Sequence, residues 1–379
     1  MSDDIIDLIR KNMNKTWPLQ LPKHKKVIEF LKVLIPTEEE AKILSIFKEP
    51  MVEVKSIKKI SKLTNLSIEK VAEICEKMAE KGTILKAGKN KFALLPIMPG
   101  LFEFYFISRK DSEENLKKAS ILFHELLDYG LLEEWYSSDY PFFRTLPTSS
   151  LKEKTKEIDI NESIDVQHQV LVYEDVESYI NMASSITIVN CACRTTAAYT
   201  GDVCEKPFDI CMALNIASEA LKPYGLGKRV TKEEALEVLK IAEKNGLVHT
   251  IINSSGQDSM MLICNCCTCH CGVLRGLTDF NNPRAFARSN YRPEINQELC
   301  KKCEKCMKIC PMKAIWHHWP HDEELSDNFM VIKENMCIGC GLCAHHCPSD
   351  AIVMNKIYND VPEATLPGVF RKIEETKKH

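Results

Sequence analysis

The spacing of apolar residues in the first hundred positions predicts three helices followed by a hairpin. Apolar positions recur at helical intervals within 37–47, 56–66 and 67–82. The first helix is expected to begin with a threonine N-cap and three glutamates, which suit the positive end of a helix dipole, and Gly82 is expected to stop the third. Two short extended runs around a Gly-Lys-Asn turn follow. We therefore expect a separate small domain over residues 1–110.

This order of elements resembles a winged helix-turn-helix domain, a fold that often reads DNA. The helix at the expected recognition position, 67–82, carries three lysines and four glutamates, a net charge of −1 (3 − 4). A helix that enters the major groove usually carries positive charge, because phosphate contacts supply much of the affinity. The pattern therefore favours a winged-helix-like unit used for packing or protein contact, with nucleic-acid binding as the alternative.

Strand and helix patterns alternate between residues 111 and 290, which indicates an α/β or α+β layer. The expected elements are helices over 112–131, 173–185 and 231–246 and strands over 169–173, 186–191, 247–253 and 259–265. Thr231 and Glu234 have the spacing of a capping box at the start of the third helix. Residues 357–379 are expected to be a solvated tail. The expected fold class is an α+β multidomain chain with an α/β cysteine-rich middle domain.

Charge and hydropathy exclude some classes of protein. The net charge of −3 and the isoelectric point near 6.4 give no general argument for nucleic acid. The longest apolar stretch, 92–107, is interrupted by two prolines, a glycine and a glutamate, so we expect no membrane span. The first residues lack the apolar core of a signal peptide. We therefore expect a cytoplasmic protein, in which thiols stay reduced.

Cysteine is unusually frequent and unevenly distributed. Seventeen of the 18 cysteines lie between residues 191 and 347, and only Cys75 stands apart, within an amphipathic helix where it is expected to be a core residue. Reduced cysteines at this density indicate metal binding rather than disulfides.

Two copies of one motif lie near the C-terminus. CKKCEKCMKICP (300–311) and CIGCGLCAHHCP (337–348) both read C-x2-C-x2-C-x3-C-P. Three thiolates at this spacing can wrap one iron–sulfur cubane, while the fourth points to the other cubane. The region 291–356 resembles two-cluster [4Fe–4S] ferredoxin domains, which transfer single electrons. The 26 residues between Cys310 and Cys337 make a longer connection than a compact ferredoxin needs, and we expect them to contact a partner or shield a cluster.

The spacing assigns the eight cysteines to two [4Fe–4S] clusters. The ligands expected for the first cluster are Cys300, Cys303, Cys306 and Cys347, and those for the second are Cys310, Cys337, Cys340 and Cys343.

The middle domain contains nine further cysteines. They are Cys191, Cys193, Cys204, Cys211, Cys264, Cys266, Cys267, Cys269 and Cys271. A cubane and a zinc ion each need four ligands, so three interpretations stay open: one or two additional iron–sulfur clusters, a structural zinc site, or a redox-active dithiol. If the run CNCCTCHC is extended, Cys264 and Cys266 face one side while Cys267, Cys269 and Cys271 face the other. Arg194, His249 and His270 are candidates to stabilise thiolates, bind metal or donate protons.

Taken together, these motifs resemble a family of cytosolic iron–sulfur proteins of anaerobic bacteria and archaea. The resemblance rests on Cys191-Ala-Cys193-Arg194, Cys204, Cys211, the CNCCTCHC run and the two ferredoxin motifs. It implies iron–sulfur clusters and no particular substrate. We expect an electron carrier that feeds or drains a partner oxidoreductase. The alternatives are a reductase acting at the cysteine-rich site, for which the chain has no nucleotide-binding fingerprint, and a redox-responsive DNA-binding regulator.

Overall fold

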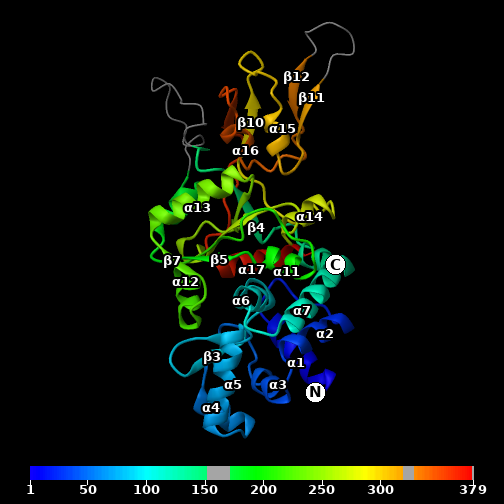
Figure 1. Ribbon diagram of the computed structural model, residues 1–379, viewed down its shortest axis with the longest axis vertical. Helices are drawn as coiled ribbons and strands as arrows, with labels where there is room; N and C mark the ends of the chain where they lie inside the picture. Colours follow the sequence, from blue (N-terminus) through cyan, green and yellow to red (C-terminus); the bar gives the residue numbers. More distant parts are fainter. Residues whose placement is uncertain (152–170, 319–327, 378–379) are drawn as a thin grey trace.

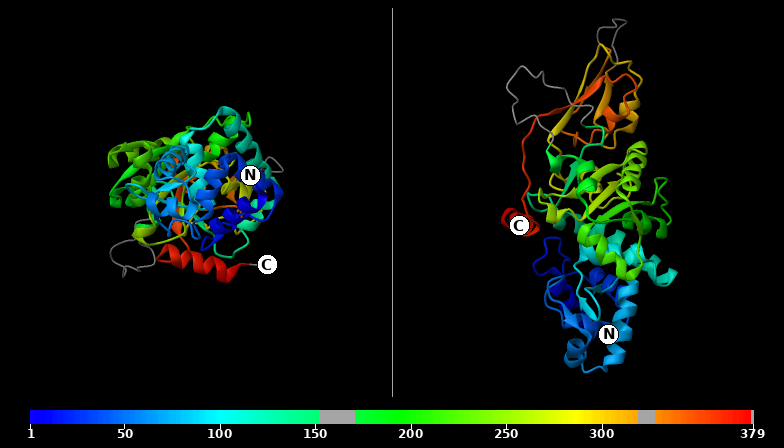
Figure 2. Two further views of the ribbon diagram at one scale, coloured as in Figure 1. Left: turned by 90° about the horizontal axis from the view of Figure 1, so that it is seen from below. Right: turned by 90° about the vertical axis from the view of Figure 1, so that its left-hand side faces the viewer.

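The computed structural model describes residues 1–151, 171–318 and 328–377. The chain folds into an elongated molecule in which the N-terminal, middle and C-terminal regions follow one another along the long axis (Figures 1 and 2). Within the described ranges, none of the helices is both long and apolar enough to cross a lipid bilayer.

The N-terminal region is mostly helical. Its elements are α1 (Asp3–Asn14), α2 (Lys25–Leu34), α3 (Glu38–Ser45), β1 (Lys55–Ser56), α4 (Ile57–Thr64), α5 (Ile68–Lys81), β2 (Leu85–Lys86), β3 (Lys91–Ala93), α6 (Phe102–Ser108), α7 (Glu113–Leu126) and α8 (Leu132–Trp135). Thr37 and Glu40 form a capping box at α3, and Gly82 ends α5 in the left-handed conformation. The three helices and the hairpin expected over 37–95 are therefore present, and β1 joins the hairpin in a sheet of order β1-β3-β2.

Packing continues across the boundary that we expected at residue 110. Helix α7 packs against α2 on one side and against α11 (Ala192–Tyr199) of the middle region on the other. One hydrophobic core extends from Ile6 in α1 through Phe123 in α7 to Cys266 in the middle sheet. The N-terminal helices therefore support the cysteine-rich region directly.

The middle region is built on one antiparallel sheet of six strands. Its remaining elements are β4 (Phe143–Leu146), α10 (Val176–Met182), β5 (Ile186–Asn190), β6 (Asp209–Leu214), α12 (Asn215–Leu221), β7 (Lys228–Val230), α13 (Lys232–Lys244), β8 (Val248–Ile252), β9 (Leu262–Cys266) and α14 (Leu274–Thr278). The strand order is β4-β8-β9-β6-β5-β7, and all pairs are antiparallel. The layer is thus of the α+β kind rather than the parallel α/β kind.

Most of the elements expected in the middle region are present, including the capping box of Thr231 and Glu234 at α13. Helices α10 and α13 cover one face of the sheet, where Ile180 and Leu239 pack on strand residues such as Ile186 and Ile263. The strand expected over 169–173 was wrong for its described part: Val172–Glu174 is a short 3-10 helix, and residues 169–170 lie outside the described ranges. Buried Glu174 holds this turn in place through contacts with Asn290 and Lys356, which the local apolar pattern cannot predict.

The C-terminal region contains two small antiparallel strand pairs and two short helices. These are β10 (Tyr291–Ile295) with β13 (Ile352–Lys356), β11 (Ile315–His318) with β12 (Phe329–Ile332), α15 (Lys305–Ile309) and α16 (Leu342–His345). The long connection between the two cysteine motifs therefore includes a strand pair, and its residues 319–327 lie outside the described ranges.

The expectation of a solvated tail was wrong for most of its length. After β13 the chain returns along the molecule and forms α17 (Leu366–Thr376), which lies beside the N-terminal and middle regions (Figure 2). Val369 and Ile373 are buried, and the ring of Phe370 packs 4.8 Å from that of Trp17. The sequence ends in charged residues, but its apolar positions recur at helical spacing and cover an apolar surface.

Candidate metal centres

Four of the C-terminal cysteines line one cavity. These are Cys310, Cys337, Cys340 and Cys343, the set expected for the second cluster. The other lining residues are almost all apolar, among them Pro293, Ile315, Ile338 and Leu342. Four sulfur donors around an apolar space are the donor set and the surroundings that a [4Fe–4S] cluster requires, so the residues present fit this group.

The first set of cysteines gathers on the other side of the same small core. The thiol of Cys306 interacts with those of Cys300, Cys303 and Cys347, and burial raises its pKa to about 11. Cys347 follows α16 in the second motif, and Cys310 follows α15 in the first. The structure thus places Cys310 beside Cys337, Cys340 and Cys343, and Cys347 near Cys306.

Backbone N–H groups donate hydrogen bonds to two of the cysteines expected to bind the second cluster. The N–H of Gly339 donates to the sulfur of Cys337 over 3.4 Å, and that of Ala314 donates to the sulfur of Cys310 over 3.3 Å. Gly339 and Gly341 have φ values of 71° and 77°, which let the chain turn tightly between successive cysteines. Hydrogen bonds of this kind stabilise thiolate ligands and tune the potential of a bound cluster.

Six of the nine middle-region cysteines form a closed ring of thiols. Each thiol interacts with two others, in the order Cys191, Cys193, Cys271, Cys266, Cys264, Cys211 and back to Cys191. Strands β5, β6 and β9 are neighbours, and Cys191, Cys211 and Cys264 lie at their ends or within them. Sheet pairing therefore brings together cysteines that are distant in sequence. We call this group the six-thiol ring.

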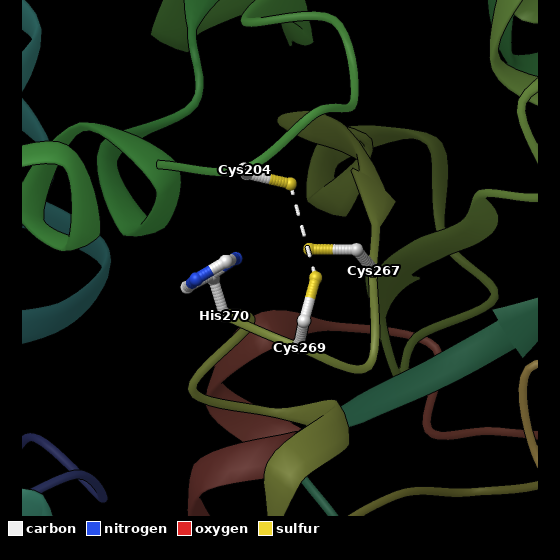
Figure 3. A group of neighbouring side chains, drawn as sticks. All are labelled: Cys204, Cys267, Cys269 and His270. Carbon is white, nitrogen blue, oxygen red and sulfur yellow. Dashed lines mark hydrogen bonds between the residues drawn. The ribbon is translucent and has the colours of Figure 1, made fainter. Parts of the chain in front are cut away.

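The remaining three cysteines form a separate group with a histidine. The ligand atoms of Cys204, Cys267, Cys269 and His270 all lie within 4.8 Å of one another (Figure 3). The alternation expected for CNCCTCHC placed Cys264 with Cys266 and Cys267 with Cys269, as found, but it was wrong for Cys271, which joins the ring. Strand β9 ends at Cys266, and the chain then turns, so the alternation of side chains stops there.

Arg194 lies between the two groups of thiols and is fully buried. Its guanidinium donates to the carbonyls of Pro207 and Asn265, each over 2.6 Å. Burial alone would lower the pKa of Arg194, but the charges of Cys191, Cys267 and Cys211 raise it. A charged guanidinium is thus held at 0% exposure beside both groups of thiols, where it favours negative charge on them.

A buried polar network connects the six-thiol ring with the C-terminal region. His249 bonds through Nδ1 to Oδ1 of Asn265 over 2.6 Å and through Nε2 to Oε1 of Glu243 over 3.0 Å. Asn265 lies between two ring cysteines, and the carbonyl of Glu243 is 2.9 Å from Nε2 of His346. Glu243 and Asn265 were not among the expected site residues, because neither carries a local sequence signal.

The C-terminal region is similar to known iron–sulfur proteins. Residues 299–351 match the family model described as 4Fe-4S dicluster domain. Pyruvate synthase subunit PorD is 39% identical over 62 residues in Methanocaldococcus jannaschii (16% of this chain, 64% of that protein) and 30% identical over 66 residues in Methanothermobacter marburgensis (17% and 68%). One chain of anaerobic dimethyl sulfoxide reductase from Escherichia coli is 33% identical over 81 residues (21% and 35%). No solved structure matches the chain significantly.

Through this region the protein belongs to the family of 4Fe-4S dicluster proteins of the ferredoxin type. The region binds two [4Fe–4S] clusters and serves in electron transfer. The chain spans only about a third to two thirds of the length of most of these relatives, and the family model covers none of its first 298 residues.

Proposed function

We propose that the protein is an electron carrier in which the dicluster domain exchanges electrons with a further iron–sulfur centre held by the six-thiol ring. The observation that carries this proposal is the closed ring itself. Six neighbouring sulfur donors exceed what one metal ion takes, and they suit a polynuclear centre. The ligands proposed for the dicluster domain are Cys300, Cys303, Cys306 and Cys347 for one cluster and Cys310, Cys337, Cys340 and Cys343 for the other.

Direct packing between the dicluster domain and the middle region supports this exchange. The N–H of Thr148, just after β4, donates to the carbonyl of Cys340 over 3.0 Å. Ile338 and Leu342, which flank Cys340, share one hydrophobic core with ring residues Cys266 and Cys271. The second ferredoxin loop and the six-thiol ring therefore border one apolar core, which gives both a low-dielectric environment.

A partner oxidoreductase is proposed as the other end of the electron path. The relatives are by name a subunit of pyruvate synthase and a chain of dimethyl sulfoxide reductase. On the dicluster domain, Trp316 and Val331 face each other across β11 and β12 and are 48% and 38% exposed. This apolar surface on the long connection between the motifs suits contact with such a partner.

For the N-terminal region we propose a winged-helix-like unit that packs or contacts protein. The order of α3, β1, α4, α5 and the hairpin supports it, as does the β1-β3-β2 sheet. The lysines of α5 form ion pairs within the chain: Lys70 with Glu39, Lys77 with Glu73 and Lys81 with Glu40. Cations that are neutralised in this way are poorly placed to bind phosphates, which disfavours the DNA-binding alternative.

The proposal is tested by counting the electrons that the anaerobic protein accepts. In a dithionite titration followed by optical and EPR spectroscopy, wild-type protein should accept more than the roughly two electrons that two cubanes take. Cys264→Ser should lose the excess and keep the dicluster signals, whereas Cys75→Ser, which alters a core cysteine far from the ring in sequence, should keep both. An unchanged electron count in Cys264→Ser would refute the proposal.

The reductase alternative is tested on the same material. Turnover of disulfide substrates by reduced protein, lost in Cys266→Ser, would make the ring a catalytic site rather than a relay. Absence of turnover with an intact electron count would favour the carrier.

A further inference from the structure

We propose that Cys204, Cys267, Cys269 and His270 bind one zinc ion, at a site separate from the six-thiol ring. The site does not depend on the electron-transfer proposal, because it uses none of the ring or dicluster cysteines.

The distances between the donors match a single tetrahedral ion. Zinc–sulfur bonds of about 2.3 Å at tetrahedral angles place two sulfur ligands about 3.8 Å apart. The sulfurs of Cys204 and Cys269 are 3.8 Å apart, and all four donors lie within 4.8 Å of one another. The sulfur ligands of a cubane bind different irons and must stand farther apart, so this group suits one ion rather than a cluster.

His270 completes the donor set. The residue is 7% exposed, and neither of its ring nitrogens has a hydrogen-bond partner among the residues that the structure describes. Nε2 lies 3.0 Å from a carboxylate oxygen of Asp202, outside hydrogen-bond geometry. A zinc-bound histidine uses one ring nitrogen for the metal and commonly directs the other to a carboxylate, so this buried imidazole has a nitrogen available for the ion. Figure 3 shows the imidazole of His270 beside the sulfurs of the three cysteines.

Backbone N–H groups are directed at two of these sulfurs, and such hydrogen bonds favour a charged sulfur. The N–H of Lys206 donates to Cys204, and that of His270 donates to Cys267. Thiolate is the form that zinc binds.

A divalent ion suits the charges around the donors. Three thiolates alone would carry −3 in a group where Cys204 and Cys267 are each only 5% exposed. With Zn²⁺ and a neutral histidine, the total is −1 (−3 + 2), which the guanidinium of Arg194 balances. A divalent cation therefore lets all three sulfurs be deprotonated while the site and Arg194 together stay neutral.

The position of the site indicates a structural role. Cys204 lies in the connection between α11 and β6, and the other three ligands lie in the turn after β9. The same two segments lead to ring cysteines Cys211, Cys266 and Cys271. A four-coordinate ion here would clamp the two segments and fix the ring, and a site closed by four protein ligands has no open position for a substrate.

The experiment measures zinc and iron per chain in anaerobically purified full-length protein by mass spectrometry of metals. Cys269 and Cys303 are both exposed, so serine at either position should preserve the fold. We expect about one zinc in wild-type protein and a more than about fivefold loss of zinc in Cys269→Ser, with its iron unchanged. Cys303→Ser, which changes a proposed dicluster ligand, should keep its zinc and lose up to about four irons. Zinc retained by Cys269→Ser, or iron lost in its place, would overturn the proposal.

A second measurement does not depend on the variants. Wild-type protein produced with Co²⁺ in place of zinc should show the intense visible bands of tetrahedral cobalt–thiolate, and these bands should be absent in Cys269→Ser. A Cys204–Cys269 disulfide in wild-type protein, detected by alkylation and peptide mapping, would contradict a metal at this position.

Discussion

Nε2 of His249 lies 3.0 Å from Oε1 of Glu243, and both side chains are almost fully buried. The same carboxylate accepts from the backbone N–H of Ser149 over 2.5 Å and from its hydroxyl over 2.9 Å. The pair therefore joins α13, β8 and the segment after β4, directly beneath the second ferredoxin loop. It fixes the position of the dicluster domain relative to the six-thiol ring.

Glu243→Gln should destabilise the fold by about 2–3 kcal/mol at pH 7, because it weakens a buried charged hydrogen-bond network. Burial would raise the pKa of Glu243, but His249 and Ser149 outweigh burial and lower it below its ordinary value of 4.5. A depressed pKa contributes stability above the unfolded value, and this contribution is lost as the pH falls through the folded value. The difference between wild type and variant should thus be full at pH 6–7 and shrink below about pH 4.5. Anaerobic urea unfolding followed by tryptophan fluorescence measures it.

Glu237→Gln provides the matched control for that experiment. Glu237 lies on the same helix, but its side chain is 65% exposed. Its replacement should change stability by less than about 0.5 kcal/mol at any of these pH values. An equal effect of the two substitutions would remove the structural role given to Glu243.

Gly339→Ala should disrupt the second cluster loop. A Cβ at this position would overlap both Oγ of Ser289 and the carbonyl oxygen of Tyr291, and φ is +71°. Iron should fall by about four atoms per chain, since the loop carries three proposed ligands of one cubane. Gly201→Ala is the control that keeps the backbone strain without the clash. At Gly201 φ is +91°, but no atom of the described residues lies within 4 Å of an added Cβ. Gly201→Ala should keep its iron; if both variants lost it equally, the clash would not be the cause.

The buried ion pair of Glu174 and Lys356 should hold the dicluster domain on the middle region. Nζ of Lys356 lies 2.8 Å from Oε2 of Glu174, with side-chain exposures of 2% and 1%. Glu174→Ala should cost about 3–5 kcal/mol, because it leaves a buried ammonium without this carboxylate. The double variant Glu174→Ala with Lys356→Met should recover part of the loss. The exposed pair of Lys228 and Glu234 is the control in a second double-mutant cycle, with a coupling expected below about 1 kcal/mol.

The dicluster domain was predictable from sequence because its signal is local. All three cysteines of each loop lie within seven residues, and the fourth follows at a fixed interval. The helices were predictable for the same reason: capping pairs such as Thr231 and Glu234 lie within one turn of each other.

The division of the nine middle cysteines could not be predicted in this way. It depends on β5, β6 and β9 being neighbours in the sheet and on the chain turning after Cys266. Local alternation therefore placed Cys271 in the wrong group. Glu243 resembles any other glutamate of α13 in sequence, and only the tertiary position of His249 gives it a role. Helix α17 was expected to be a solvated tail because the chain ends in charged residues, although its apolar residues recur at helical spacing.

The central proposal is that the six-thiol ring holds an iron–sulfur centre in addition to those of the dicluster domain. Iron and acid-labile sulfide in anaerobically purified wild-type protein test this most directly. Two cubanes contribute about eight irons and eight sulfides per chain. We predict about twelve or more irons with a matching excess of sulfide, and a return to about eight in Cys264→Ser. Eight irons and eight sulfides in fully loaded wild-type protein would contradict the account.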